Sequence, residues 1–119
     1  MSIGVDICEI DRLRKIIEQH HERFINKIFT TEEIKYCQRK QDPAPSFAVR
    51  FAAKEALLKA LGTGLRDGIR WRDMEVTNDP HGKPFLRVTG RAGELLKGRQ
   101  VEVSLSHTGE NAIAFVLLK

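Results

Sequence analysis

Hydrophobic residues recur along the chain at intervals that predict strands near both ends and helices between them. Residues 3–7 alternate between apolar side chains and Gly or Asp, which predicts a short strand. From residue 11 to about residue 29 the apolar positions follow helical spacing, at Leu13, Ile17, Phe24 and Ile28. Thr30 and Glu33 then stand in the relation of a capping box, which predicts a further helix to about Gln38.

Two prolines separate this helix from the next one. The segment QDPAP, residues 41–45, is predicted to be a loop because Pro43 and Pro45 cannot continue a helix. Ser46 stands where an N-cap belongs, so we expect the third helix to begin there and to end at Gly62.

The rest of the chain is predicted to be rich in strands. Residues 71–76 and 85–88 are expected strands around a turn at 78–84. A short helix at 92–96, a strand at 101–106, a turn at 108–111 and a final strand at 112–118 complete the order β-α-α-α-β-β-α-β-β. This order predicts an α+β fold with helices packed on a mostly antiparallel sheet. The length and the lack of repeats or linkers predict that residues 1–119 form a single domain.

Composition excludes several classes of protein. A hydrophobic content of 41% with 30% charged residues argues against disorder. No apolar run approaches the ~18 residues of a membrane span, and the acidic N-terminal segment does not resemble a signal peptide. Cys8 and Cys37 have neither a disulfide framework nor metal-ligand spacing, so we expect a reducing cytoplasm. The net charge of +4 suggests an anionic partner without identifying it.

Two carboxylates in apolar surroundings are candidate metal ligands. Asp6 lies inside the first predicted strand, where it must be either exposed at an edge or bound to a partner. Glu55 shares a helix stripe with Lys59, Ala48 and Ala52; it forms either an exposed ion pair with Lys59 or part of a ligand site. Two carboxylates from separate elements suit a hard cation such as Mg²⁺, with water and phosphate oxygens as its other ligands. Lys59 could then contact a phosphate.

Two further segments are open to two interpretations each. The polar residues that end the strand 101–106, including Ser106 and His107, form either an anion or substrate contact or a solvated hairpin turn. Gly62 and Gly64 either lend backbone N–H groups to a phosphate or simply terminate the preceding helix.

Four motifs together resemble a known family. They are Gly4-Val5-Asp6, RFAAKEALLKALGTG at residues 50–64, Gly82-Lys83-Pro84, and SLSHT at residues 104–108. In this order and spacing, over essentially the whole chain, they resemble the holo-[acyl-carrier-protein] synthases, the short bacterial type of 4'-phosphopantetheinyl transferase. The resemblance implies transfer of the phosphopantetheine arm of coenzyme A to a serine of apo acyl carrier protein, with release of adenosine 3',5'-bisphosphate, in fatty acid biosynthesis.

The resemblance also implies roles for individual residues. Asp6 and Glu55 would hold Mg²⁺ against the pyrophosphate of coenzyme A, and Lys59 would neutralise phosphate charge. Arg50 would contact phosphate from across a subunit boundary. For the base that takes the serine proton, Glu55 is the first choice and His107 the second.

The same resemblance assigns the remaining coenzyme contacts. Ser106 and His107 would contact the coenzyme, and Gly82, Lys83 and Pro84 would line its adenine end. Gly62 and Gly64 stay candidates for backbone contacts to phosphate.

The first long helix carries a candidate partner surface. Its shared basic and polar face consists of Arg12, Lys15, Gln19, Arg23, Asn26 and Lys27, with Ile16 beside it. A small acidic helical protein suits this face, because charges would steer the encounter and the isoleucine would add a contact. Acyl carrier protein fits that description. A nucleic-acid-binding module is the rival class, although 7% aromatic content without basic–aromatic interleaving argues against it. A different Mg²⁺-dependent phosphoryl enzyme would keep the carboxylates and lose the carrier face.

Assembly follows from size and from the resemblance. One domain of this length has little room to enclose both a dinucleotide-sized substrate and a protein partner. The synthases that the chain resembles are trimers, which implies sites between subunits, with Asp6 and Glu55 from one copy and Arg50 from the next. The motif helix has apolar residues around much of its circumference, so we expect it to lie at the interface.

Overall fold

Four α-helices, five strands and one short 3₁₀ helix follow one another along the chain. The computed structural model describes residues 1–119. Its elements are β1 (Ser2–Glu9), α1 (Ile10–Ile28), α2 (Thr31–Gln38), α3 (Ala44–Leu61), η1 (Trp71–Asp73), β2 (Met74–Asn78), β3 (Pro84–Val88), α4 (Gly90–Leu96), β4 (Val101–His107) and β5 (Asn111–Leu118). The order of helices and strands is the one predicted from the sequence.

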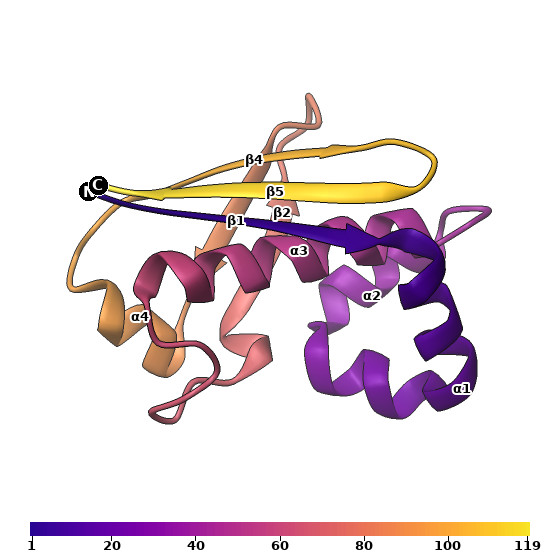
Figure 1. Cartoon of the computed structure of the whole chain (residues 1–119), viewed down its shortest axis with the longest axis horizontal. Coiled ribbons are helices and arrows are strands. Elements are labelled where there is room, and N and C mark those ends of the chain that lie inside the picture. Colours follow the sequence, from indigo (N-terminus) through magenta and orange to yellow (C-terminus); the bar gives the residue numbers. More distant parts are fainter.

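The strands form two antiparallel sheets. In the larger sheet β5 lies between β1 and β4, and the smaller sheet is the β2–β3 hairpin. Residues 2–9 of β1 pair with β5 along its whole length, so the two chain termini lie side by side (Figure 1). The predicted α+β class, with helices packed on antiparallel strands, is confirmed.

Helix α3 is the centre of the molecule. It contacts β1, β5 and β4 of the larger sheet, and also α1, α2 and β2. Its apolar residues are buried on nearly all sides within the subunit. The premise that one small core could not cover this helix is therefore wrong, and its position at a subunit interface stays a prediction. The sheet and three other elements cover the helix.

Apolar residues that are not covered lie instead on the outer face of the larger sheet. Ile3, Val5 and Ile7 of β1 are 61%, 51% and 63% exposed. They pair across the ladder with Leu117, Phe115 and Ile113 of β5, of which the last two are also exposed. The alternation that predicted the first strand is thus real, but its apolar residues point away from the core.

Two helix boundaries and one strand differ from the predictions. Helix α3 begins at Ala44, so Pro45 and Ser46 lie inside its first turn. A proline is tolerated there because the first N–H groups of a helix have no partner within the helix. Residues 71–73 form η1 instead of the start of a strand, and β2 begins at Met74. The capping box of Thr30 and Glu33 is confirmed.

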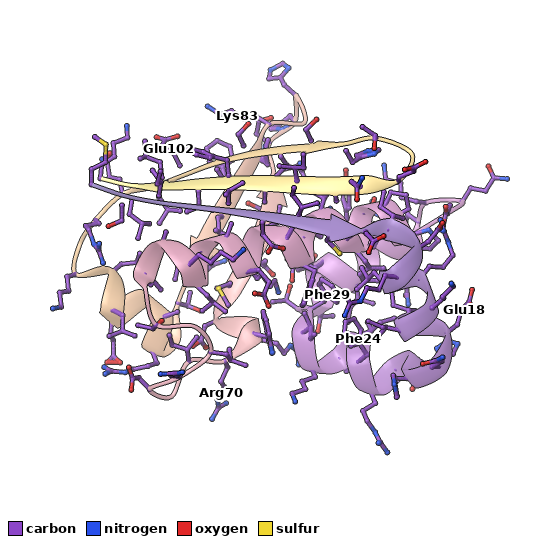
Figure 2. The ribbon with its side chains drawn as sticks, in the orientation of Figure 1. Glu18, Phe24, Phe29, Arg70, Lys83 and Glu102 are labelled. Carbon is purple, nitrogen blue, oxygen red and sulfur yellow. The ribbon has the colours of Figure 1, made fainter.

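Helix α1 is bent at one residue. His21 has φ 42° and ψ −124°, values that interrupt the helix and favour glycine. Beyond the bend, Phe24 packs edge to face on Phe29, with ring centroids 6.4 Å apart (Figure 2). The predicted basic face is therefore split into two segments of different direction, with Arg12, Lys15 and Ile16 before the bend and Arg23 after it.

A buried ion pair ties the helices to the hairpin. The Lys54 ammonium donates to a Glu33 carboxylate oxygen at 2.6 Å and to the backbone oxygen of Ile28 at 2.6 Å, and both charged side chains are fully buried. The other Glu33 oxygen accepts from the backbone N–H of Val76 at 2.9 Å. Burial lowers the pKa of Lys54, an effect that the Glu33 carboxylate opposes. The pair thus joins α1, α2, α3 and β2 at one point.

None of the helices is both long and apolar enough to span a membrane.

Candidate functional site

Strand β1 lies unusually close to α3, and this approach brings the two candidate carboxylates together. A Cβ atom on Gly4 would lie 2.0 Å from the backbone oxygen of Ala56 and 2.7 Å from the backbone nitrogen of Ala60. Only glycine fits at this position, so the strand can rest directly on the helix. Two residues further along β1, the side chain of Asp6 points to the same inner face and meets Glu55 of α3 at one pocket.

The pocket that contains Asp6 and Glu55, here called the carboxylate pocket, has a volume of about 330 Å³. Cys8 of β1, Arg12 and Ile16 of α1 and Phe51 of α3 also line it. Arg12 and Ile16, two of the predicted carrier-binding residues, therefore adjoin the candidate metal ligands. Lys15 is exposed on the same segment of α1, whereas Arg23 lies beyond the bend.

Charged groups in and beside the carboxylate pocket act on one another. The Lys59 ammonium donates to Asp6 Oδ1 at 3.0 Å and to the backbone oxygen of Val5 at 3.0 Å. The pKa of Glu55 is raised, chiefly by partial burial and then by the negative charge of Asp6, while Lys59 opposes the shift. A cation between the carboxylates would remove this repulsion.

Three carboxylates line the carboxylate pocket, those of Asp6, Glu9 and Glu55, and the charge of Asp6 acts on Glu55. No group of three or more His, Cys, Asp or Glu side chains is arranged to hold a metal ion. The pair therefore fits a hard divalent cation that takes its remaining oxygen ligands from water and from a substrate. It does not fit a cation that needs a full set of protein ligands.

The two alanines that share the helix stripe of Glu55 and Lys59 do not reach the candidate site. Ala48 and Ala52 are fully buried in the hydrophobic core and do not form the floor of the carboxylate pocket. Small side chains at these positions serve the close packing of α3 against its neighbours.

A second pocket, here called the Arg50 pocket, lies on another part of the chain and has a volume of about 490 Å³. Arg50 of α3, Gly82 and Pro84 of the hairpin and His107 at the end of β4 all line it. No residue lines both this pocket and the carboxylate pocket. The predicted site residues are thus gathered into two groups and not into one.

The side chain of Arg50 is buried, with only 5% of the residue exposed, and several contacts hold it in place. Its Nη1 donates to the backbone oxygen of Ser46 at 3.2 Å, and its Nη2 donates to Asn78 Oδ1 at 3.0 Å. The guanidinium carbon lies 4.2 Å from the ring centre of Tyr36. The buried Nε has no hydrogen-bond partner within the protein.

Other predicted residues lie outside both pockets. Ser106 alternates with His107 along β4, so it points to the opposite, outer face of the sheet. Lys83 lies at the tip of the hairpin, with its ammonium 5.6 Å from the ring centre of Phe85 (Figure 2). Gly62 is the left-handed C-cap of α3, and Gly64 follows it in an exposed loop. The structure therefore does not bring these four residues to the groups that they were predicted to join.

Tyr36 and Asn78 were missed by sequence reasoning. Tyr36 lies on α2 and Asn78 ends β2, so each reaches Arg50 through a tertiary contact. No local motif marks either residue, and the sequence alone carries no signal for these contacts.

Comparison with known proteins identifies the family. A sequence model of the 4'-phosphopantetheinyl transferase superfamily matches residues 2–116. A holo-[acyl-carrier-protein] synthase of Geobacter sp. (strain M21) is 50% identical over 119 residues, which cover 98% of this chain and 95% of that protein. The chain belongs to the 4'-phosphopantetheinyl transferase superfamily. The relative in Geotalea daltonii with the same name matches the transferase with 45% identity and the same coverage.

Solved structures match the transferase over nearly all of its length. A holo-(acyl-carrier-protein) synthase from Bacillus anthracis in complex with CoA (3',5'-ADP) has a TM-score of 0.84 and 35% identity, covering 98% of this chain and 94% of that one. The synthase from Neisseria meningitidis has a TM-score of 0.89 and 33% identity, covering 99% and 97%. The predicted fold and the predicted transfer of phosphopantetheine from coenzyme A to acyl carrier protein are confirmed.

Proposed function

We propose that residues 1–119 form one transferase unit, that three units form a ring, and that each active site combines the carboxylate pocket of one unit with the Arg50 pocket of the next. The observation that carries this proposal is the separation of the predicted site residues into two pockets with no lining residue in common. Coenzyme A has a pyrophosphate, a nucleotide and a long arm, and neither pocket offers groups for all three.

The outer face of the larger sheet supports assembly. Exposed Val5 and Phe115 form a cross-strand pair at its middle, flanked by the exposed pair of Ile7 and Ile113. Contiguous exposed apolar area of this kind is typical of protein–protein contacts. A second copy of the chain is the partner proposed for this face, since ring closure would cover all three faces equally.

In the carboxylate pocket, Asp6 and Glu55 would hold Mg²⁺, and Lys59 would neutralise phosphate charge. When bound, such a cation supplies charge neutralisation at the phosphate oxygens and stabilises the leaving group. The serine oxygen of the carrier forms a bond to the phosphorus that bears the pantetheine arm. The bond from this phosphorus to the bridging oxygen breaks, and adenosine 3',5'-bisphosphate leaves. Glu55 is the proposed acceptor of the serine proton, because its carboxylate lies at the pocket where the phosphate would bind.

In the Arg50 pocket, the free Nε of Arg50 supports binding of an anionic group. A buried donor without a partner is costly, and a phosphate oxygen would satisfy it. Gly82 and Pro84 would line the adenine end, and His107 would provide a further polar contact.

The proposed location of the reaction is the cytoplasm, where thiols stay reduced. Both cysteines are free thiols. Burial raises the pKa of Cys8 to about 11 and that of Cys37 to about 12, so neither is a reactive thiolate at neutral pH.

Complementation between two inactive variants tests the shared site. Co-expressed Glu55→Ala and Arg50→Ala chains should form mixed rings in which some interfaces join an intact Glu55 to an intact Arg50. With random assembly from equal amounts, about a quarter of the interfaces are competent, so activity should recover to about a quarter of the wild-type value. The measurement is the mass gain of apo acyl carrier protein.

The matched control pairs Glu55→Ala with the double variant Glu55→Ala/Arg50→Ala. No interface then has an intact Glu55, so no activity should return. An active monomer in light scattering, or no recovery from mixed oligomers, would contradict the shared site.

The segment of α1 before the bend is the proposed docking surface for the carrier. Arg12→Glu is expected to raise KM for acyl carrier protein about three- to tenfold while KM for coenzyme A changes little, because a reversed charge repels an acidic partner. Added salt should weaken carrier binding of the wild type, since exposed charges are screened over about 8–10 Å. Steady-state kinetics with each substrate varied measures both effects.

Arg70→Glu is the control for this prediction. It makes the same change in net charge at a residue outside α1, at the lower edge of the view in Figure 2, whereas Glu18 of α1 lies at its right side. An equal rise in KM for both variants would mean that net charge and not the α1 surface governs docking. Binding of RNA or DNA with an affinity comparable to that for the carrier would favour the nucleic-acid alternative.

A further inference from the structure

The buried side chain of Arg50 is held by hydrogen bonds and by an aromatic contact. Its partners come from three elements, with Tyr36 on α2, Ser46 on α3 itself and Asn78 on β2. A guanidinium has five N–H donors in a fixed plane, so contacts to both terminal nitrogens and to one face determine the direction in which Nε points. The side chain is therefore fixed with one donor left free.

Asn78 contributes to this arrangement through both ends of its amide. Its Oδ1 accepts from Arg50, and its Nδ2 donates to the backbone oxygen of Gly82 at 3.1 Å. The reverse amide orientation would place a donor against the guanidinium and an acceptor against a carbonyl, so the two partners define the orientation. One side chain thus sets the position of the hairpin turn relative to Arg50.

The turn itself is held from its other side by Asp79. The Asp79 carboxylate accepts from the backbone N–H groups of His81 and Lys83, at 2.8 and 2.9 Å. Consequently the turn has its own internal shape, and the Asn78 amide links this shape to Arg50 of α3. Loss of the Asn78 side chain would break this link without unfolding the turn.

Tyr36 contributes through the face of its ring. The ring centre lies 4.2 Å from the guanidinium carbon of Arg50, and the ammonium of Lys40 lies 4.9 Å from the same ring. The phenolic oxygen makes no hydrogen bond within the protein, so the contact depends on the aromatic face and not on the hydroxyl. A guanidinium stacked in this way has one face covered by the ring, while its N–H donors stay in its own plane.

We propose that Tyr36 and Asn78 are positioning residues for coenzyme binding, which hold the Arg50 guanidinium at the Arg50 pocket and fix the Gly82 turn at the wall of that pocket. The inference rests on the proposed function, in which this pocket takes the nucleotide end of coenzyme A. Neither residue needs to touch the reacting phosphorus, so their effect belongs to binding of the coenzyme and not to the chemical step.

The first test compares matched variants by calorimetric titration with coenzyme A. Tyr36→Leu and Asn78→Ala should each raise Kd about three- to tenfold, because a cation–π contact or a hydrogen bond to a charged group is lost. Tyr36→Phe keeps the ring face and should raise Kd at most about twofold. Thr77→Ala is the control beside Asn78, because the Thr77 hydroxyl makes no hydrogen bond and the change should not alter Kd. Thermal unfolding of each variant shows that it is folded.

The decisive test repeats two of these changes in an Arg50→Ala background. If Tyr36 and Asn78 act through Arg50, the same changes should add little to the Kd of Arg50→Ala, since effects on one shared group are not additive. Kinetics should also show a rise in KM for coenzyme A with kcat and KM for the carrier within about twofold of wild type.

Three results would overturn the inference while leaving the proposed function intact. They are an unchanged Kd in Tyr36→Leu and Asn78→Ala, an equal loss in Tyr36→Phe and Tyr36→Leu, and full additivity with Arg50→Ala. Failure of the wild-type protein to bind coenzyme A would instead contradict the proposed function.

Discussion

Glu55→Gln is expected to reduce transfer of phosphopantetheine at least about a hundredfold, because it removes both a metal ligand and the proposed base while keeping the shape of the side chain. Glu55 is only partly buried and makes no hydrogen bond within the protein, so the fold should persist. Chelation of divalent cations with EDTA should abolish transfer in the wild type, and added Mg²⁺ should restore it. Mass spectrometry of apo acyl carrier protein measures the product in each case.

Glu94→Gln on α4 is the control for this prediction. It removes the same charge from an exposed carboxylate that pairs only with Arg91, at 3.6 Å, and should leave the rate unchanged. Full activity of Glu55→Gln in the presence of Mg²⁺, or full activity of the wild type in EDTA, would refute the assignment of the carboxylate pocket.

Lys54→Met is expected to lower the free energy of unfolding by about 3–5 kcal/mol, because it leaves the Glu33 carboxylate buried without its counter-ion. Methionine keeps most of the apolar stem of lysine, so the loss should come from the charge and not from a cavity. Addition of Glu33→Gln to this variant should restore part of the stability, since the uncompensated charge is then removed. Urea denaturation followed by circular dichroism measures each value.

Lys35→Met provides the comparison with an exposed pair. Lys35 lies 3.9 Å from Glu32, and both side chains are largely exposed, so its replacement should cost less than about 1 kcal/mol. A loss in Lys54→Met no larger than in Lys35→Met would show that the buried pair does not hold the elements together.

Local patterns predicted the elements well, and their failures have local causes. Helical spacing located α1, but nothing in the pattern around His21 indicates a bend, since a positive φ is uncommon for any residue other than glycine. The rule that proline ends a helix placed the N-cap of α3 at Ser46, three residues after the observed N-cap Pro43, because Pro45 occupies the first turn, where proline is tolerated. The predicted first and last residues of a helix depend on such details more than the prediction that a helix is present.

The alternation in β1 illustrates a deeper limit. A period of two predicts a strand whichever face is buried, and the usual assumption places the apolar face inside. Here Gly4 and Asp6 face α3, whereas Val5 faces outward. Which face is inside follows from the packing of the whole subunit and its partners, information that no single strand contains.

For the candidate site, motifs identified Asp6, Glu55 and Arg50, but their grouping into two pockets required the fold. The arrangement of Arg50 with Asn78 spans 28 residues of sequence and depends on how the hairpin docks on α3. Ser106 lies outside both pockets because neighbouring residues of one strand point to opposite faces, although the sequence motif predicts one shared contact for Ser106 and His107.

Helix α3 carries Arg50 and Glu55 only five positions apart, about 7.5 Å along the helix axis. In the proposed ring these two residues serve different active sites, so each copy of α3 connects two neighbouring active sites. A shift of α3 at one active site would then also move its residue in the neighbouring active site. The three active sites would be coupled around the ring, so that substrate binding at one site would affect the geometry of the other two.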